Sequence, residues 1–289
     1  MPNLIDLRRR IRSVKNTQQI TSAMKMVAAS KLRRAQQKVI ASRPYSSLLR
    51  EMLAGLLDSL PEDSAVLEHP LLARREEKRI SLLLISGDKG LCGAFNSNVF
   101  RAAESFLSKK AGAELDLALI GRRGRDYYKR TNRHVTGEWV DLFSKPIEFA
   151  AAKKIAGQLI ERYTREEVDA VYLLHNEFKS VLSQKILLEP LLPIRPTGGN
   201  QGSRQEYIYE QAPETIFRDL LPRYIEVSVY HAMLESAAAE HASRMTAMDA
   251  ATRNAGEMIE KLTLHLNRVR QASITNDLIE VISGAQALE

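Results

Sequence analysis

Cysteine is almost absent from this chain of 289 residues, which contains only Cys92. A single cysteine cannot form an internal disulfide, and this composition suits a reducing compartment. The sequence also lacks an apolar run of about 18 residues, the length that a membrane-spanning helix needs. The basic residues near the N-terminus are not followed by the apolar core of a signal peptide, so we expect no secretory leader.

Proline and glycine are scarce near both ends of the chain. Residues 3–42 contain neither, and Gly256 is the only glycine between residues 222 and 284. Because glycine and proline are the strongest breakers of regular structure, their absence predicts long helices. We expect helices over residues 3–42, 46–60 and 222–288. Arg43-Pro44 should separate the first two. The last would be roughly 100 Å long and would need something to lie against.

The C-terminal helix carries a four-three apolar repeat, the spacing of a coiled-coil seam. Its seam positions are Leu234, Ala238, His241, Met245, Met248, Thr252, Ala255, Ile259, Leu262, Leu266, Val269, Ser273 and Asn276. The N-terminal helix begins with a similar stripe, which then drifts in phase. This stripe comprises Leu4, Leu7, Ile11 and Val14, followed by Ile20, Met24, Val27 and Leu32.

The two ends of the chain are complementary in charge. Residues 1–50 hold twelve basic side chains and one acidic one, whereas residues 223–289 hold six basic and nine acidic ones. Opposite charge favours pairing of two helices. We therefore expect the N- and C-terminal helices to form an antiparallel α-helical coiled coil.

The middle of the chain changes period. Short apolar runs over residues 80–86, 115–120 and 170–174 have the composition of buried strands. Helical patterns cover residues 97–110, 124–130 and 147–163. Alternating strands and helices predict a central Rossmann-like α/β domain with a largely parallel sheet. The expected organisation is a helix at 1–60, a connection at 61–77, the α/β domain at 78–195, a linker and foot segment at 196–212, and a coiled-coil helix at 213–289.

Candidate chemistry is sparse. The glycine-rich turn at residues 87–93 follows a strand and precedes a helix, where phosphate-binding loops sit. It matches neither the P-loop pattern nor G-x-G-x-x-G, so we interpret it as a structural turn. Cys92 has no neighbouring histidine to activate it. The histidines lack metal-ligand spacing; they are His69, His134, His175, His231, His241 and His265. We expect no catalytic site, no cofactor and no metal.

Polar residues occupy the end of the C-terminal seam. Ser273 and Asn276 stand where a stable coiled coil prefers apolar side chains. Polar seam residues lower stability and specify a partner or a register. This pattern favours a helix tip that turns or slides against a partner.

Motifs in three regions of the chain together resemble the gamma subunit of the F-type ATP synthase. They are RRRIRSVKNTQQITSAMKMVAASKLRRA at residues 8–35, SGDKGLCGAFNSN at 86–98, and RMTAMDAATRNA with RQASITNDLIEVISGA near the C-terminus. The similarity runs over essentially the full length and in the same order. It implies a rotor shaft that transmits torque from the membrane c-ring to the catalytic beta subunits of the alpha–beta ring, with chemistry on beta. It also implies contact with the epsilon subunit.

The resemblance implies particular contact residues. Those for coupling to alpha and beta are Met24, Lys25, Lys31, Arg244, Arg270, Gln271, Thr275 and Glu280. Those for the rotor ring and epsilon are Tyr207, Tyr209 and Glu210. A lone cysteine does not allow the thiol control of chloroplast relatives. With no organellar transit peptide, we expect a bacterial protein at the cytoplasmic face of the plasma membrane, held there by its partners.

Two other interpretations remain open from the residues alone. The basic N-terminal helix could bind phosphate backbones, which would make the chain a coiled-coil nucleic-acid-binding adaptor. The α/β domain could instead be a small nucleotide-binding enzyme.

Overall fold

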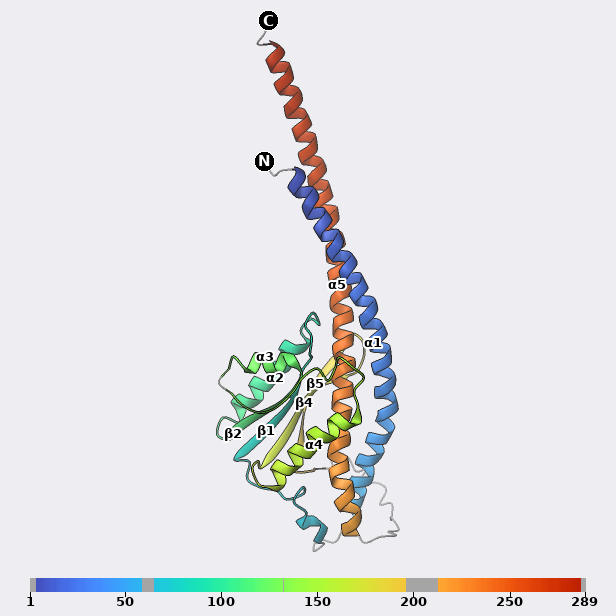
Figure 1. Cartoon of the computed structure of the whole chain (residues 1–289), viewed down its shortest axis with the longest axis vertical. Helices are drawn as coiled ribbons and strands as arrows, with labels where there is room; N and C mark the ends of the chain where they lie inside the picture. The colour runs from blue at the N-terminus through green and yellow to red at the C-terminus, as the bar shows by residue number, and fades with distance from the viewer. Residues whose placement is uncertain (1–3, 59–64, 132, 196–212, 287–289) are drawn as a thin grey trace. The chain divides into compact units, whose positions relative to one another are not determined.

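The computed structural model describes residues 4–58, 65–131, 133–195 and 213–286 (Figure 1). It divides into two compact units. Unit 1 comprises Met1–Ala29 and Arg244–Glu289, and unit 2 comprises Ser30–Ser243. Helices α1 (Leu4–Asp58) and α5 (Pro213–Gln286) each contribute to both units. The expected fold class, a central α/β domain combined with two long terminal helices, is confirmed.

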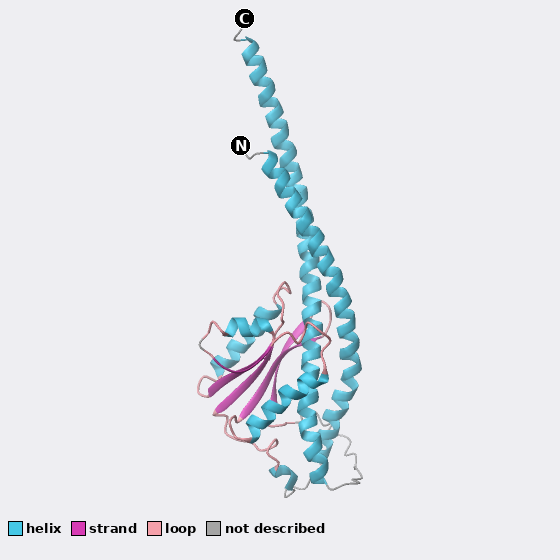
Figure 2. Cartoon of the chain, viewed as in Figure 1, coloured by secondary structure: helices cyan, strands magenta, loops and turns pink. Residues whose placement is uncertain are grey.

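Unit 2 contains a five-stranded sheet, drawn in magenta in Figure 2. Its strands are β1 (Arg79–Ile85), β2 (Glu114–Ile120), β3 (His134–Trp139), β4 (Ala170–Phe178) and β5 (Gln184–Leu192). The spatial order is β3-β2-β1-β4-β5, and every neighbouring pair is parallel except β4 with β5. This order and the parallel core define a Rossmann-like sheet.

Helices cover both faces of this sheet. Alternate residues of β1 pack with α2 (Phe95–Lys109) in one apolar core, which includes Leu82 and Val99. On the opposite face, Arg162 of α4 (Phe149–Thr164) binds Asp116 of β2 with an Nη2–Oδ2 distance of 2.6 Å. A short helix, α3 (Arg122–Tyr128), follows β2, and a 3-10 turn, η1 (Ala65–Glu68), precedes β1.

The two edge strands were not expected from the sequence. β3 alternates between exposed and half-buried residues and contains Gly137, so it lacks the apolar run that marks the inner strands. β5 contains Pro190, and a proline within a run of residues argues against an inner strand. An edge strand tolerates proline because one side of its backbone needs no ladder hydrogen bonds.

The expected break at Arg43-Pro44 is wrong, because α1 continues through Pro44 to Asp58. Hydroxyl groups stabilise this part of the helix: Ser46 and Ser47 both donate to the carbonyl of Arg43 at 3.0 Å. The buried stripe also keeps its phase across the proline, through Val39 and Leu49. Packing of this stripe therefore overrides the local preference of proline to end a helix.

The predicted phase drift in the first half of α1 is also wrong. The less exposed residues keep the three-four spacing without interruption, at Leu4, Leu7, Ile11, Val14, Gln18, Thr21, Lys25, Ala28 and Leu32. Ile20 and Val27, which the apolar pattern places in the stripe, are 61% and 56% exposed. The seam of this helix is therefore partly polar, and several of its apolar side chains face outward.

None of the described helices contains a stretch that is long and apolar enough to cross a membrane.

Candidate functional site

The two helices of unit 1 pair in an antiparallel register. Lys25 donates to Asp249 with an Nζ–Oδ1 distance of 2.5 Å, and the hydroxyls of Thr21 and Thr252 are 2.8 Å apart. Residue numbers therefore fall along α1 as they rise along α5. Thr21 and Lys25, two polar residues in the seam of α1, each meet a polar partner on α5, which removes most of the cost of placing them there. The expected antiparallel pair is confirmed within this unit.

Helix α5 extends past the described start of α1. By the register above, Leu4 lies level with Arg270, so residues 271–286 continue as a single helix (Figure 1). Burial ends accordingly: Ser273 is half-buried and Asn276 is exposed. Asn276, which the four-three repeat places at a seam position, thus lies beyond the part of α5 that pairs with the described residues of α1.

Apolar side chains cover this single-helix extension. More than half of each of these side chains is exposed: Ile274, Leu278, Ile279, Val281 and Ile282. An isolated apolar helix surface of this size is unfavourable in water and marks an interaction site. The exposed apolar side chains of the extension therefore mark it as a candidate surface for binding a partner.

The predicted coupling residues fall into two groups. Arg270, Gln271, Thr275 and Glu280 are all exposed and lie at the base of the extension or within it. Met24, Lys25 and Arg244 belong to the paired part of unit 1 and are half-buried, whereas Lys31 is exposed on the part of α1 that belongs to unit 2. The structure therefore does not gather these residues into one cluster.

Lys25 has a partner within the chain. Its ammonium group lies on Asp249, and this hydrogen bond lowers the pKa of the Asp249 carboxyl group. Arg253 also approaches the same carboxylate, at 3.5 Å. Sequence reasoning missed Asp249, although the opposite charges of the two chain ends pointed to such a pair.

The predicted contact residues for the rotor ring and epsilon, Tyr207, Tyr209 and Glu210, lie outside the described residues.

The glycine-rich turn after β1 is held by Asp88. Its Oδ1 accepts from the backbone N–H groups of Arg122 and Asp141 at 3.0 and 2.9 Å, and its Oδ2 accepts from that of Phe143 at 2.9 Å. Both carboxylate oxygens are thus occupied by backbone from the segments after β2 and β3. Cys92 is buried in the same turn.

Helix α5 fills the place where a ligand binds in many sheets of this type. In such sheets the ligand crevice lies beyond the carboxyl ends of the strands, where the strand order reverses, here between β1 and β4. Glu240 lies so close to Gly87 that an added Cβ would be 3.0 Å from its carboxyl carbon. Ser236 accepts the N–H of Asn176 at 3.2 Å from the end of β4. The crevice therefore receives side chains of the protein's own helix.

A buried carboxylate fastens both long helices to the sheet within unit 2. Glu235 of α5 is 2% exposed, and its Oε1 accepts from Arg43 of α1 at 3.0 and 3.1 Å. Its Oε2 accepts the N–H of Phe178 at 2.9 Å, and Arg43 also donates to the Phe178 carbonyl at 3.0 Å. Three elements thus meet at one charged group, for which no motif in the sequence gave a signal.

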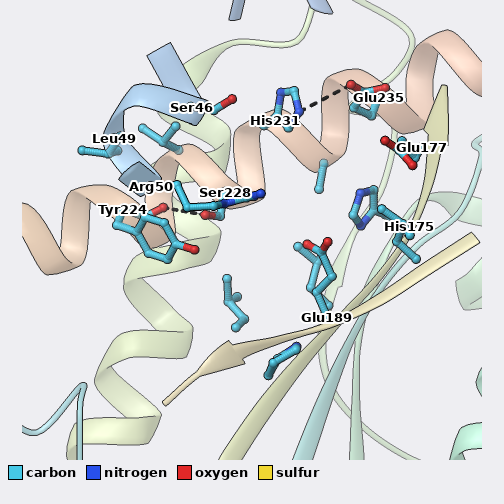
Figure 3. Close-up of a pocket in the computed structure, with 16 residues that line it drawn as sticks. Ser46, Leu49, Arg50, His175, Glu177, Glu189, Tyr224, Ser228, His231 and Glu235 are labelled. Atoms are coloured by element: carbon cyan, nitrogen blue, oxygen red, sulfur yellow. Dashed lines mark hydrogen bonds and ion pairs between the residues drawn. The ribbon is translucent and has the colours of Figure 1, made fainter. Parts of the chain in front are cut away.

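Beside this contact lies a polar cavity of about 120 Å³, shown in Figure 3. Side chains from α1, β4, β5 and α5 line it, among them Arg50, His175, Glu189 and His231. His175 is 4% exposed, and its Nδ1 has no hydrogen-bond partner among the described residues. No group of three or more histidine, cysteine or acidic residues within the described ranges is arranged to hold a metal ion.

Known proteins resemble this chain in sequence. Residues 3–288 match a family model described as ATP synthase. The chain is 54% identical to the ATP synthase gamma chain of Solibacter usitatus and 46% identical to that of Pelotomaculum thermopropionicum, with all of both chains covered in each case.

Solved structures agree in fold. A chain from the central stalk and c-ring of the mitochondrial ATP synthase of Tetrahymena thermophila superposes with a TM-score of 0.64 at 27% identity, over 80% of this chain and 99% of that one. A chain from the mitochondrial ATP synthase of Euglena gracilis has a TM-score of 0.68 at 18% identity, over 99% and 94%, which is a likeness of fold.

The combination of paired terminal helices with a Rossmann-like domain, shared with a chain of a central stalk, makes this protein a member of the class of stalk proteins. Within this class, the chain belongs to the ATP synthase gamma chain family. The resemblance found in the sequence is thereby confirmed. The comparisons support neither a nucleic-acid-binding adaptor nor an independent nucleotide-binding enzyme.

Proposed function

We propose that the chain is the central rotor shaft of a proton-translocating F-type ATP synthase. It transmits torque from the membrane c-ring to the catalytic beta subunits, couples proton flow to ATP synthesis and regulates ATP hydrolysis. The observation that carries this proposal is the single-helix extension at residues 271–286, whose apolar side chains are exposed.

The extension suits a shaft that is enclosed by other chains. A ring of alternating alpha and beta subunits would cover the apolar face and remove it from water. The exposed polar residues Gln271, Thr275 and Glu280 share the same short helix. Apolar and polar contacts together would let the shaft bind one conformation of a beta subunit more strongly than another. Such a difference in binding is what drives a conformational change.

The second group of predicted coupling residues fits the same role. Met24 lies in the paired helices of unit 1, and Lys31 faces outward from α1. We assign Arg244 and Arg270 to contacts with the same ring. Lys25 would act through Asp249, so its part is to hold the two helices together as well as to meet beta.

The chain has no catalytic site of its own in this proposal, and ATP chemistry takes place on beta. The crevice beyond β1 and β4 supports this assignment, because Glu240 and Ser236 lie in it. Tyr207, Tyr209 and Glu210 remain the proposed contacts with the c-ring and epsilon. The protein would lie at the cytoplasmic face of a bacterial plasma membrane as a peripheral subunit.

The test is reconstitution of the full chain with alpha, beta, epsilon and the membrane sector in vesicles. Replacing Leu278 and Ile282, each 58% exposed, by aspartate would place charge on the face that the ring covers. We expect ATP-driven proton pumping per ATP hydrolysed to fall about tenfold or more, because a buried unpaired charge costs several kcal/mol.

Leu182→Asp is the matched control. Leu182 is 84% exposed and lies between β4 and β5, away from the extension in sequence. This variant should pump as the parent does. Pumping per ATP that is unchanged in the Leu278 and Ile282 variant would contradict the shaft assignment. ATP hydrolysis by the purified chain alone would contradict the absence of a catalytic site.

A further inference from the structure

The junction around Glu235 contains two histidines with contrasting partners. His231 of α5 places its Nδ1 3.2 Å from the hydroxyl oxygen of Ser42, and its Nε2 is 3.4 Å from Oε1 of Glu235. His175 of β4 borders the same cavity, and its Nδ1 has no hydrogen-bond partner among the described residues (Figure 3). Neither imidazole has a part in the proposed rotor function.

His231 and Glu235 join α5 to α1 through separate contacts. The hydroxyl of Ser42 lies 2.9 Å from the carbonyl oxygen of Val39 and 3.2 Å from Nδ1 of His231. The neutral imidazole carries one proton, on Nδ1 or on Nε2, so it can donate only one hydrogen bond, to Ser42 or to Glu235. Arg43 donates to Oε1 of Glu235 through Nε and Nη2.

Protonation of His231 changes this arrangement. Both ring nitrogens are then donors, one toward Ser42 and one toward Oε1 of Glu235. The imidazolium brings a second positive charge beside Arg43, which joins α1 to α5 through the same carboxylate oxygen. Repulsion between these two cations opposes the contact between the helices.

Charged groups from every surrounding element face the cavity. Arg50 comes from α1, Glu177 from β4, Glu189 from β5, and Tyr224, His231 and Glu235 from α5, while Arg43 of α1 binds Glu235 beside the cavity. Burial lowers the pKa of His175 to about 4, with smaller contributions from His231 and Arg50, while Glu177 acts in the opposite direction. Burial likewise lowers the pKa of His231, and Glu235 opposes that shift.

We propose that this junction is an acid-sensitive fastening, which holds α1 and α5 on β4 while both imidazoles are neutral and loosens when they take up protons. The direction of this pH dependence follows from the linkage between protonation and folding. Because each folded pKa lies below the unfolded value, the fastening is fully stable above about pH 6.5 and weakens as the pH falls. For His175 alone, the open fraction would rise up to tenfold per pH unit between about 6.5 and 4.

Hydrogen exchange of the full chain tests this proposal. The N–H of Phe178 is the probe, because it donates to Glu235 at the junction. We expect its protection, corrected for the intrinsic exchange rate, to fall about tenfold or more between pH 7 and pH 5. Protection of β1 amides, such as Leu83, should change far less over the same range.

A variant carrying His231→Gln and His175→Asn removes both titrating groups and keeps polar side chains in place. Its protection at Phe178 should be independent of pH between 7 and 5. His134→Asn is the control, since His134 is exposed on β3 and should leave the acid response intact. An acid response that persists in the double variant, or is missing from the parent chain, would overturn the proposal.

Nuclear magnetic resonance of the parent chain gives a second measurement that does not depend on folding of the variant. The imidazole of His175 should remain neutral at pH 5.5, in line with its lowered pKa. Titration of His175 near pH 6.5, as for an exposed histidine, would reject the fastening.

Discussion

The same helix, α5, lies in two opposite surroundings. Residues 232–240, in unit 2, are all buried, so the helix is enclosed on every side. Residues 255–273, in unit 1, are less exposed only along one stripe that recurs every three or four positions. The enclosed stretch contains small residues such as Ala237, Ala238 and Ala239, whereas the stripe uses larger ones such as Ile259 and Leu266. The enclosed stretch also holds larger residues, among them Met233 at 0% and Glu235 at 2% exposure, so its surroundings accommodate side chains of mixed size.

The two regions also differ in how α1 and α5 are joined by charge. In unit 2, Arg43 binds Glu235, and these side chains are 47% and 2% exposed. In unit 1, Lys25 binds Asp249, and these side chains are 45% and 36% exposed. The two cations are almost equally exposed, so the difference lies in the carboxylates: solvent screens Asp249 more strongly than the buried Glu235.

The largest expected effect is at Glu235. Replacing it by alanine leaves the buried N–H of Phe178 without an acceptor and Arg43 without its partner. We expect the free energy of unfolding of unit 2 to fall by about 2–4 kcal/mol. Urea denaturation followed by tryptophan fluorescence of Trp139, in β3, would measure it. A loss below about 1 kcal/mol would show that the buried contact resembles an exposed one.

A smaller effect is expected from enlarging an enclosed alanine. Ala239→Leu adds three carbon atoms where the side chain is 0% exposed, so we expect a loss of about 1–3 kcal/mol from overpacking. Ala272→Leu is the matched change on the exposed extension and should alter stability by less than about 0.5 kcal/mol. Urea denaturation measures the free energy of unfolding of both variants. Equal losses would show that the enclosed and the exposed parts of α5 tolerate a larger side chain equally well.

The polar seam of unit 1 should gain stability from apolar replacement. Thr21 and Thr252 bond to each other across the pair, and changing both to valine removes two hydroxyls together. Because neither is left unpaired, we expect stabilisation of up to about 1 kcal/mol, visible as slower hydrogen exchange in residues 244–260. Thr252→Val alone should be less favourable, since it leaves Thr21 without this partner.

The smallest effect is expected at Asp249. Asp249→Asn keeps the size of the side chain but removes the charge that pairs with Lys25. Hydrogen exchange of the adjacent α5 amides should rise by only about twofold, and the difference should shrink in high salt. A change as large as that of Glu235→Ala would mean that exposure does not separate the two ion pairs.

The inner strands were predictable because burial on both faces requires continuous apolar runs. All but the first residue of β1 are buried, and its sequence shows this directly. Edge strands have no such signature. In β3, Gly137 lies under the ring of Trp139, where a Cβ would be 2.6 Å from the nearest ring atom, and no apolar periodicity reveals that contact.

The seam of unit 1 shows a different limit of sequence reasoning. Apolar periodicity follows one helix at a time, so it assigned Ile20 and Val27 to the stripe. The helices are matched in pairs instead, with Thr21 on Thr252 and Lys25 on Asp249. Pairing of polar residues across an interface is a property of two segments, and here they lie more than two hundred positions apart. The family motifs, by contrast, were readable without any packing information.

That separation has a consequence for synthesis of the protein. Lys25 and Asp249 are 224 residues apart in the chain. At about 5–20 residues per second, a ribosome adds Asp249 roughly ten to forty-five seconds after Lys25. During this interval the seam of α1, which includes the buried residues Leu7 and Ala28, has no α5 to pair with. Chaperones have that time in which to bind the N-terminal segment, and the C-terminal segment completes unit 1 last.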